Sequence, residues 1–160
     1  MVAAVQGPRG EQSMLVRSFV EDAIRSVQPK DYLGEILAIQ NFVAERVRYV
    51  NDPLHVELVK DPQRLVEEVD YYGTALGDCD ELAAMVACCL LQVGRVCEFV
   101  VVGFGGPGEY SHVFVRVLEP RSQQWIVCDI VAGTDVRGML DSVTTWYSVS
   151  LDELPERIAA

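Results

Sequence analysis

The stretch YYGTALGDCDELAAMVACCLLQVG, residues 71–94, joins a polar connection to a strongly apolar segment. Residues 79–93 are apolar almost all the way round a helix, which predicts a central, buried helix rather than an amphipathic surface helix. Cys79 falls in the first turn of this helix, between Asp78 and Asp80. Its surroundings therefore decide whether it is a small core residue or a nucleophile.

The start of this helix can stabilise a thiolate despite the two neighbouring carboxylates. Free backbone N–H groups and the positive end of the helix dipole lower the pKa of a cysteine in the first turn. Asp78 is placed to act as the N-cap residue. Side chains at adjacent helix positions point in different directions, so Asp78 and Asp80 need not contact the sulfur of Cys79.

Helices are expected before this stretch and strands after it. Apolar residues recur with helical spacing in two segments, and Asp61 followed by Pro62 marks the start of a third, short helix. Several β-rich runs follow, joined by loops of hairpin length. The expected helices span residues 12–27 and 31–47, and the expected strands span 95–104, 111–118, 124–131 and 143–150. This order predicts an α+β fold in which the N-terminal helices and the buried helix pack on an antiparallel sheet.

Composition favours a single domain over residues 1–160, because half of the residues are hydrophobic and can build a core. Residues 1–11 contain Gly and Pro and are expected to be flexible. The formal net charge of -11 argues against nucleic acid or an anionic membrane as a partner, since both need a cationic face.

The cysteines favour a reducing compartment. The sequence has five of them, no signal-peptide pattern and no long uncharged apolar run, which predicts reduced thiols in a cytoplasmic protein. Cys88 and Cys89 lie on the buried helix, and Cys128 alternates to the strand face opposite Asp129, so these three are expected in the core. Zinc is disfavoured because no C-x2-C pair is present.

A nucleophilic thiolate also needs a base and a group that orients the base. His112 begins the run SHVFVRV, and Asp129 lies late in the run QWIVCDIV. If these strands form a hairpin with its loop at residues 119–122, His112 lies opposite Asp129, and alternation places both on one face. A buried carboxylate needs a partner. The pairing therefore predicts a Cys–His–Asp arrangement at the start of the helix that carries Cys79.

These residues resemble the transglutaminase-like core of the papain-like cysteine enzymes. In that core Gly-x-Cys opens a buried helix, a His begins one strand, and an Asp follows a Trp near the end of the next, as in GDCDELAAMVACCLLQVG, YSHVFVRV and QWIVCDIV. The resemblance covers residues 45–131 and implies Cys79 as nucleophile, His112 as base and Asp129 as orienter. One departure is Ile130, which follows the Asp where many members have Pro.

The resemblance implies acyl transfer from an amide of a peptide or protein through a Cys79 thioester, with no metal or organic cofactor. Hydrolysis is favoured over transamidation. The backbone N–H of Cys79 is the natural first oxyanion donor, and Tyr49, Asp78 and Tyr110 are the candidates for a second donor or for the cleft. The form GDCDE is most similar to small members from bacteria, bacteriophages and prophages.

Other interpretations stay open at this level. Cys79 could be a core residue and His112 a hydrogen-bonded strand residue, in which case the chain is a catalytically silent structural or assembly protein. His55, in a turn-rich segment, is expected to be an exposed loop residue, with a place at the cleft rim as the alternative. The Gly-rich run GFGGPGEY, residues 103–110, is expected to be a mobile hairpin loop beside His112 that could close over the cleft.

Overall fold

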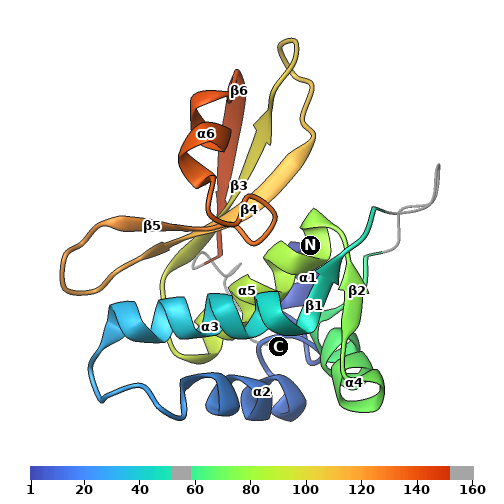
Figure 1. Cartoon of the computed structure of the whole chain (residues 1–160), viewed down its shortest axis with the longest axis vertical. Coiled ribbons are helices and arrows are strands. Elements are labelled where there is room, and N and C mark those ends of the chain that lie inside the picture. Colours follow the sequence, from blue (N-terminus) through green and yellow to red (C-terminus); the bar gives the residue numbers. More distant parts are fainter. Residues whose placement is uncertain (52–58, 152–160) are drawn as a thin grey trace, which may run out of the picture.

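In the computed structural model, the first four helices occupy one end of the molecule, the four-stranded sheet and the last helix occupy the other, and helix α5 lies between them (Figure 1). The structure describes residues 1–51 and 59–151. The helices are α1 (Val2–Val5), α2 (Met14–Ile24), α3 (Tyr32–Arg46), α4 (Pro62–Tyr72), α5 (Cys79–Gln92) and α6 (Val136–Asp141). The strands are β1 (Val47–Tyr49), β2 (Ala75–Gly77), β3 (Cys97–Gly103), β4 (His112–Leu118), β5 (Trp125–Cys128) and β6 (Thr145–Ser150). The predicted α+β fold is confirmed.

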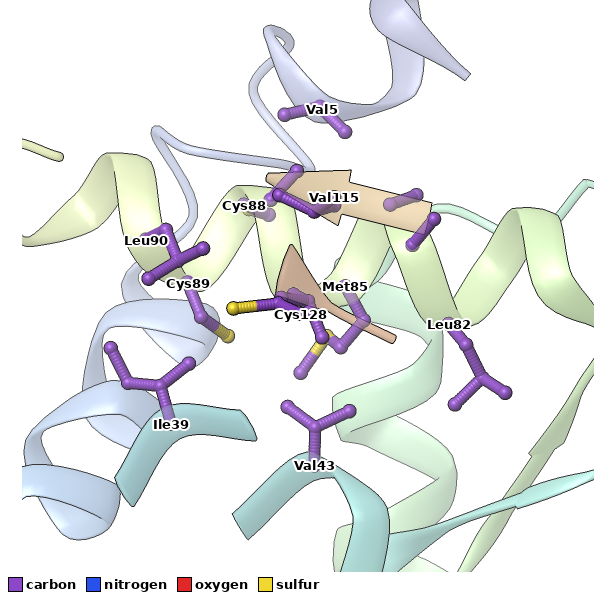
Figure 2. Close-up of a cluster of buried hydrophobic side chains, with 14 of the residues drawn as sticks. Val5, Ile39, Val43, Leu82, Met85, Cys88, Cys89, Leu90, Val115 and Cys128 are labelled. Carbon is purple, nitrogen blue, oxygen red and sulfur yellow. The ribbon is translucent and has the colours of Figure 1, made fainter. Parts of the chain in front are cut away.

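Helix α5 is the centre of the core, as its sequence predicts. Every residue from Glu81 to Leu90 is buried. The helix contacts α1, α2, α3 and α4 as well as strands β3 and β4, so no side of it is left to solvent over these residues. Figure 2 shows Ile39 and Val43 of α3 and Val115 of β4 packed around it. The apolar composition of this helix is therefore explained by its position between the helical layer and the sheet.

The main sheet has the strand order β5-β4-β3-β6 and is antiparallel throughout. Alternation along the strands gives it two apolar faces. The inner face, which includes Val113, Val115 and Val117, joins the core around α5. The opposite face carries a second group, here called the outer cluster, which consists of Val100, Val102, Phe114, Val127, Met139 and Val143. The outer cluster attaches α6 to the sheet.

The hairpin between β4 and β5 forms in a register two residues away from the predicted one. Val115 pairs with Cys128 and Leu118 with Trp125, so the connection is longer than the predicted loop at residues 119–122. The carboxylate of buried Glu119 accepts hydrogen bonds from backbone N–H groups inside this connection. The added length is explained by these bonds. Because the shift is even, every side chain keeps its predicted face.

Part of residues 1–11, which the sequence predicts to be flexible, packs into the core of the structure. Val5 is 0% exposed and belongs to the main core, and α1 packs on α5. The side-chain amide of Gln6 donates a hydrogen bond of 3.2 Å to the backbone carbonyl of Leu151, at the other end of the described chain. The small residues of this segment allow a short helix to pack closely against α5, which composition alone does not reveal.

Two further features were not predicted from the sequence: helix α6 and a separate parallel pair formed by β1 and β2. Strands of three residues are too short to show a clear alternation of polar and apolar side chains. The β1–β2 pair places Tyr49 opposite Gly77, and Gly77 comes two residues before Cys79. This small sheet therefore helps to build the surroundings of the cysteine.

The cysteines have the burial that was predicted. All five lie within the described residues and are free thiols, and four of them are buried. Cys88, Cys89 and Cys128 belong to the main core, and burial raises the pKa of Cys89 and of Cys128 to about 12. Cys79 is the one that is partly exposed. Over the described ranges, none of the helices has the length and apolar character needed to cross a membrane.

Candidate active site

Cys79 is the first residue of α5, and Asp78 is the N-cap, as predicted. The carboxylate of Asp78 accepts a hydrogen bond of 2.8 Å from the backbone N–H of Asp80. The capping box is closed by Glu81, whose Oε2 accepts the backbone N–H of Asp78 at 2.7 Å. Two backbone donors at the helix start are thus occupied by side chains. Asp78, which precedes Cys79, is held through both its carboxylate and its backbone N–H.

Glu81 has a structural role that extends beyond the cap. Its side chain is 1% exposed, and Oε1 accepts the backbone N–H of Lys60 at 3.0 Å. Burial raises the pKa of this carboxyl, against the opposing effect of the two backbone hydrogen bonds. A Cβ on Gly77 would lie 2.8 Å from the Cβ of Glu81 and 3.2 Å from its Oε2. The glycine of the GDC run is therefore required by Glu81, not by its own backbone conformation.

Replacing Gly77 by alanine should destabilise the protein by about 2 kcal/mol, because an added methyl group overpacks the buried carboxylate. The same change should slow any reaction of Cys79, since the cap that fixes the helix start must move. Urea denaturation measures the first effect, and the rate of Cys79 alkylation measures the second. Gly106→Ala is the matched control, because its Cβ meets no atom closer than 3.5 Å; an equal loss in both variants would contradict the explanation.

Asp80 lies close to the sulfur of Cys79. Its Oδ1 is 3.8 Å from the Sγ of Cys79, in the position of an acceptor for the thiol hydrogen. The sequence left such a contact open, and the structure forms it for Asp80. Helix side chains tilt toward the N-terminus. Cys79 and Asp80 are the first two residues of α5, so both side chains project beyond the helix start, where there is no preceding turn to keep them apart.

Partly exposed His112 and buried Asp129 form a pair. The His112 Nε2 and the Asp129 Oδ2 are 2.7 Å apart, and the two side chains are 10% and 1% exposed. The second carboxylate oxygen, Oδ1, accepts the backbone N–H groups of Val131 at 2.9 Å and of Ala132 at 3.0 Å. Both oxygens therefore have partners, as a buried carboxylate requires.

The turn that holds Asp129 was not predicted, although the sequence contains a signal for it. Aspartate commonly accepts the N–H groups two or three residues ahead, closing an Asx-type turn. Here that turn comes directly after β5 and fixes the carboxylate toward His112. Ile130 stands where the resemblance leads us to expect a proline. The turn does not depend on this residue, because the backbone N–H groups of Val131 and Ala132 bond to the Asp129 carboxylate and that of residue 130 is not used.

The pair changes the proton affinity of the imidazole. Burial of His112 disfavours the imidazolium, but the hydrogen bond with Asp129, followed by the hydrogen bond with Cys79 and the charges of both groups, outweighs it and raises the pKa of His112 to about 9. Because Nε2 is occupied by Asp129, Nδ1 is the ring nitrogen left for Cys79. Cys79 and Asp129 also line one narrow gap between α5 and the sheet. The structure thus brings the cysteine, histidine and aspartate together.

The three candidates for a second oxyanion donor or for the cleft differ in position. Asp78 is committed to the cap. Tyr49 lies near Cys79: burial raises the pKa of its phenol, and the charges of Cys79 and Asp78 raise it further, while its hydroxyl donates to Asn51 at 2.7 Å. Tyr110 packs edge-to-face on Tyr147 of β6, with ring centroids 4.9 Å apart. His55 lies outside the described residues.

The connection between β3 and β4, residues 104–111, borders the pair from the sheet side. Phe104 stacks on the His112 ring with centroids 6.5 Å apart, a contact that was not predicted. The hydroxyl of Thr144 donates 2.9 Å hydrogen bonds to the carbonyls of Gly103 and Gly105. These bonds brace the base of the Gly-rich loop; its closure over the cleft stays a prediction.

Asp78, Cys79 and Asp80 present ligand atoms within 4.8 Å of one another. The cluster has one sulfur and two carboxylates, whereas structural zinc sites use four ligands that are mainly cysteine and histidine. The N-cap of α5 and the thiol contact of Asp80 already account for the geometry of these residues.

Neither the protein-family models nor the curated protein sequences include a match to this chain. Solved structures do share its fold. A candidate protease from Parabacteroides distasonis ATCC 8503 is 14% identical with a TM-score of 0.57, over 85% of this chain and 26% of that chain. A candidate cysteine protease from Cytophaga hutchinsonii is 13% identical with a TM-score of 0.58, over 94% of this chain and 56% of that chain. The likeness is one of fold, an α+β core of the papain-like kind, and this chain spans less than two thirds of either protein.

Proposed function

We propose that the protein is a cysteine-dependent hydrolase or acyltransferase of the transglutaminase-like type, acting on an amide bond of a peptide or protein. The observation that carries this proposal is the His112–Asp129 pair, 2.7 Å between Nε2 and Oδ2, beside a partly exposed cysteine at the first residue of a helix. Structural neighbours named as proteases support the same reaction class.

In the reactive form the proton of the Cys79 thiol rests on Nδ1 of His112, whose raised pKa favours the imidazolium. The thiolate then attacks the carbonyl carbon of the amide, and the carbonyl electrons move to oxygen. The backbone N–H of Cys79 is a donor for this oxyanion. The imidazolium returns its proton to the leaving nitrogen, the C–N bond breaks, and a thioester on Cys79 remains. Asp129 keeps the imidazole oriented and stabilises its positive charge.

Deacylation repeats these steps with an acceptor in place of the thiol. His112 removes a proton from water, the hydroxide oxygen attacks the thioester carbon, and the C–S bond breaks to release a carboxylic acid and the Cys79 thiol. We favour water as the acceptor, which makes the protein a peptidase or amidase; an amine acceptor makes it a crosslinking enzyme. The steps use the side chains of this chain and need no metal or organic cofactor.

The setting is part of the same proposal. Free thiols at all five cysteines fit a reducing compartment such as the cytoplasm, and the resemblance of the GDCDE run points to a bacterial, phage or prophage source. The acidic chain, with its net charge of -11, favours peptide or protein substrates over nucleic acid or anionic membranes.

One observation favours the alternative, a catalytically silent structural or assembly protein. The Oδ1 of Asp80 accepts the thiol of Cys79 at 3.8 Å, and a carboxylate at that distance opposes thiolate formation. An active enzyme must therefore overcome Asp80 through His112 and the start of helix α5. The two proposed functions therefore differ in whether the Cys79 thiol is ionised near neutral pH.

The experiment that separates them is the rate of Cys79 alkylation by iodoacetamide against pH, located by peptide mass spectrometry in wild type, His112→Ala and Asp129→Asn. We expect wild-type labelling well below pH 8 that is lost in His112→Ala, because the imidazolium with its raised pKa stabilises the thiolate. At pH 7 a thiol with an ordinary pKa of about 8.5 is only a few per cent ionised. Labelling in all three proteins that follows this ordinary titration would establish the silent scaffold instead.

A further inference from the structure

A hollow of about 570 Å³ lies beside His112. It is open toward solvent and is formed where the turn after β5, helix α6 and the start of β4 meet. The side chains around it are Phe104, Ser111, His112, Val131, Asp135 and Met139, with Ala132, Gly138 and Ser142 completing its wall. None of these residues was identified from the sequence as part of a binding site except His112.

The hollow is continuous with the proposed reaction centre. His112 forms part of its wall, and Val131 lines both the hollow and the narrow gap that contains Cys79 and Asp129. In the proposed reaction His112 protonates the nitrogen that leaves. The leaving half of the substrate must therefore contact the imidazole. The space beside the imidazole then receives the side chain of the residue on the leaving side of the scissile bond.

The lining determines which side chain fits. Phe104 and Val131 expose 41% and 40% of their surface, and Met139, a member of the outer cluster, also lines the hollow. Exposed apolar side chains of this size gain free energy when a ligand covers them. Asp135 is the charged side chain at the rim besides His112. Its carboxylate, together with an acidic protein, repels a second carboxylate.

We propose that this hollow is the subsite for the residue on the leaving side of the scissile amide, and that it accepts a large apolar side chain and rejects an acidic one. The inference rests on the proposed function, because it needs the thioester on Cys79. It adds the substrate preference of the leaving half, which Phe104, Val131, Met139 and Asp135 determine.

The test uses the reverse of the leaving step. Cys79 is acylated with p-nitrophenyl acetate, and leucinamide, glycinamide or the α-amide of aspartate competes with water for the acetyl thioester. The amine nitrogen attacks the thioester carbon, the C–S bond breaks, and the amine proton passes to His112. Mass spectrometry measures each N-acetyl product, after subtraction of the uncatalysed reaction in Cys79→Ala. We expect leucinamide to be acetylated at least about tenfold faster than glycinamide, which is the discrimination that an apolar pocket provides.

Two variants assign the preference to the hollow. Met139→Ala should reduce the ratio of leucinamide to glycinamide by about threefold or more, whereas Leu140→Ala should leave it unchanged, because Leu140 is on the same helix but lines a different groove. Asp135→Asn should raise the rate with the aspartate amide. Asparagine retains the N-cap of α6, where Asp135 accepts the backbone N–H of Gly138 at 3.2 Å, so this variant tests the charge even if Met139→Ala fails to fold.

The outcomes are distinct. Release of p-nitrophenol that does not depend on Cys79 would overturn the proposed function, and the subsite with it. Acetylation of Cys79 followed by equal reaction of leucinamide and glycinamide would leave the function standing and overturn the subsite. A preference for leucinamide that Met139→Ala and Leu140→Ala reduce equally would also overturn the assignment to this hollow.

Discussion

Replacing His112 by alanine should slow the acylation of Cys79 by p-nitrophenyl acetate at pH 7 by a factor on the order of 10²–10⁴, the usual contribution of a positioned acid–base group. The imidazole is the group that must hold the thiol proton, and its Asp129 partner raises its affinity for that proton. Removing the ring leaves Cys79 beside the Asp80 carboxylate alone, where the thiol form is favoured. The release of p-nitrophenol after mixing measures the rate.

Tyr71→Ala is the matched control, because Tyr71 is exposed on α4 and packs on Tyr72 instead of on the pair. It should change the rate by less than about threefold, as expected for a surface change outside the reaction centre. Added imidazole should partly restore the His112→Ala rate, since the space left by the ring can admit it. If His112→Ala and Tyr71→Ala react like the wild type, His112 does not act on Cys79.

The buried helix and its cap were predictable because their signals are local. An apolar segment with a polar residue before it predicts a buried helix with an N-cap, and Asp78 and α5 follow that pattern. The capping box was also visible as the spacing between Asp78 and Glu81, but the role of Glu81 was not assigned. Its importance comes from a third bond, to the backbone of Lys60, and nothing in the local sequence indicates that partner.

The pairing of His112 with Asp129 was predicted correctly from an incorrect register. The structure pairs Leu118 with Trp125, two residues beyond the expected partner. An even shift retains the face of each side chain, and the imidazole is long enough to reach a carboxylate on a diagonal neighbour of the same face. An odd shift would have turned the Asp129 side chain to the face of the sheet that Cys128 occupies. It would then point away from His112, and the pair would not form. The parity of the hairpin, which the hydrophobic alternation determines, thus mattered more than its loop length.

The hollow beside His112 and the burial of Val5 could not be predicted, because both depend on contacts distant in sequence. Val5 enters the core only through the position of α5. Helix α6 forms a wall of the hollow through Met139, which reaches Phe114 across the outer cluster. Such contacts are determined by the arrangement of the layers, whereas capping and alternation are determined by neighbouring residues.

Stability should fall as the pH rises from 6 to above 9, because the His112–Asp129 pair loses its proton in that window. The folded pKa of His112 is about 9, above the ordinary value of 6.5. The folded state therefore binds the proton more tightly than the unfolded state, so the pair stabilises the fold fully below pH 6.5 and loses this contribution as the pH passes through about 9. Each tenfold difference in proton affinity corresponds to about 1.4 kcal/mol, which gives a loss on the order of 3 kcal/mol.

The measurement is the free energy of unfolding in urea at pH 6.0 and at pH 9.5, in wild type and in His112→Gln. Glutamine can still donate a hydrogen bond to Asp129 but does not titrate, so the difference between the two proteins isolates the imidazole from the lysines and cysteines that also titrate at high pH. Asp129→Asn should shift the loss of stability toward lower pH, because the hydrogen bond from the carboxylate and its charge no longer raise the pKa of His112. An equal fall in wild type and His112→Gln would assign the pH dependence to other groups and would leave the pair without the proton that the proposed reaction requires.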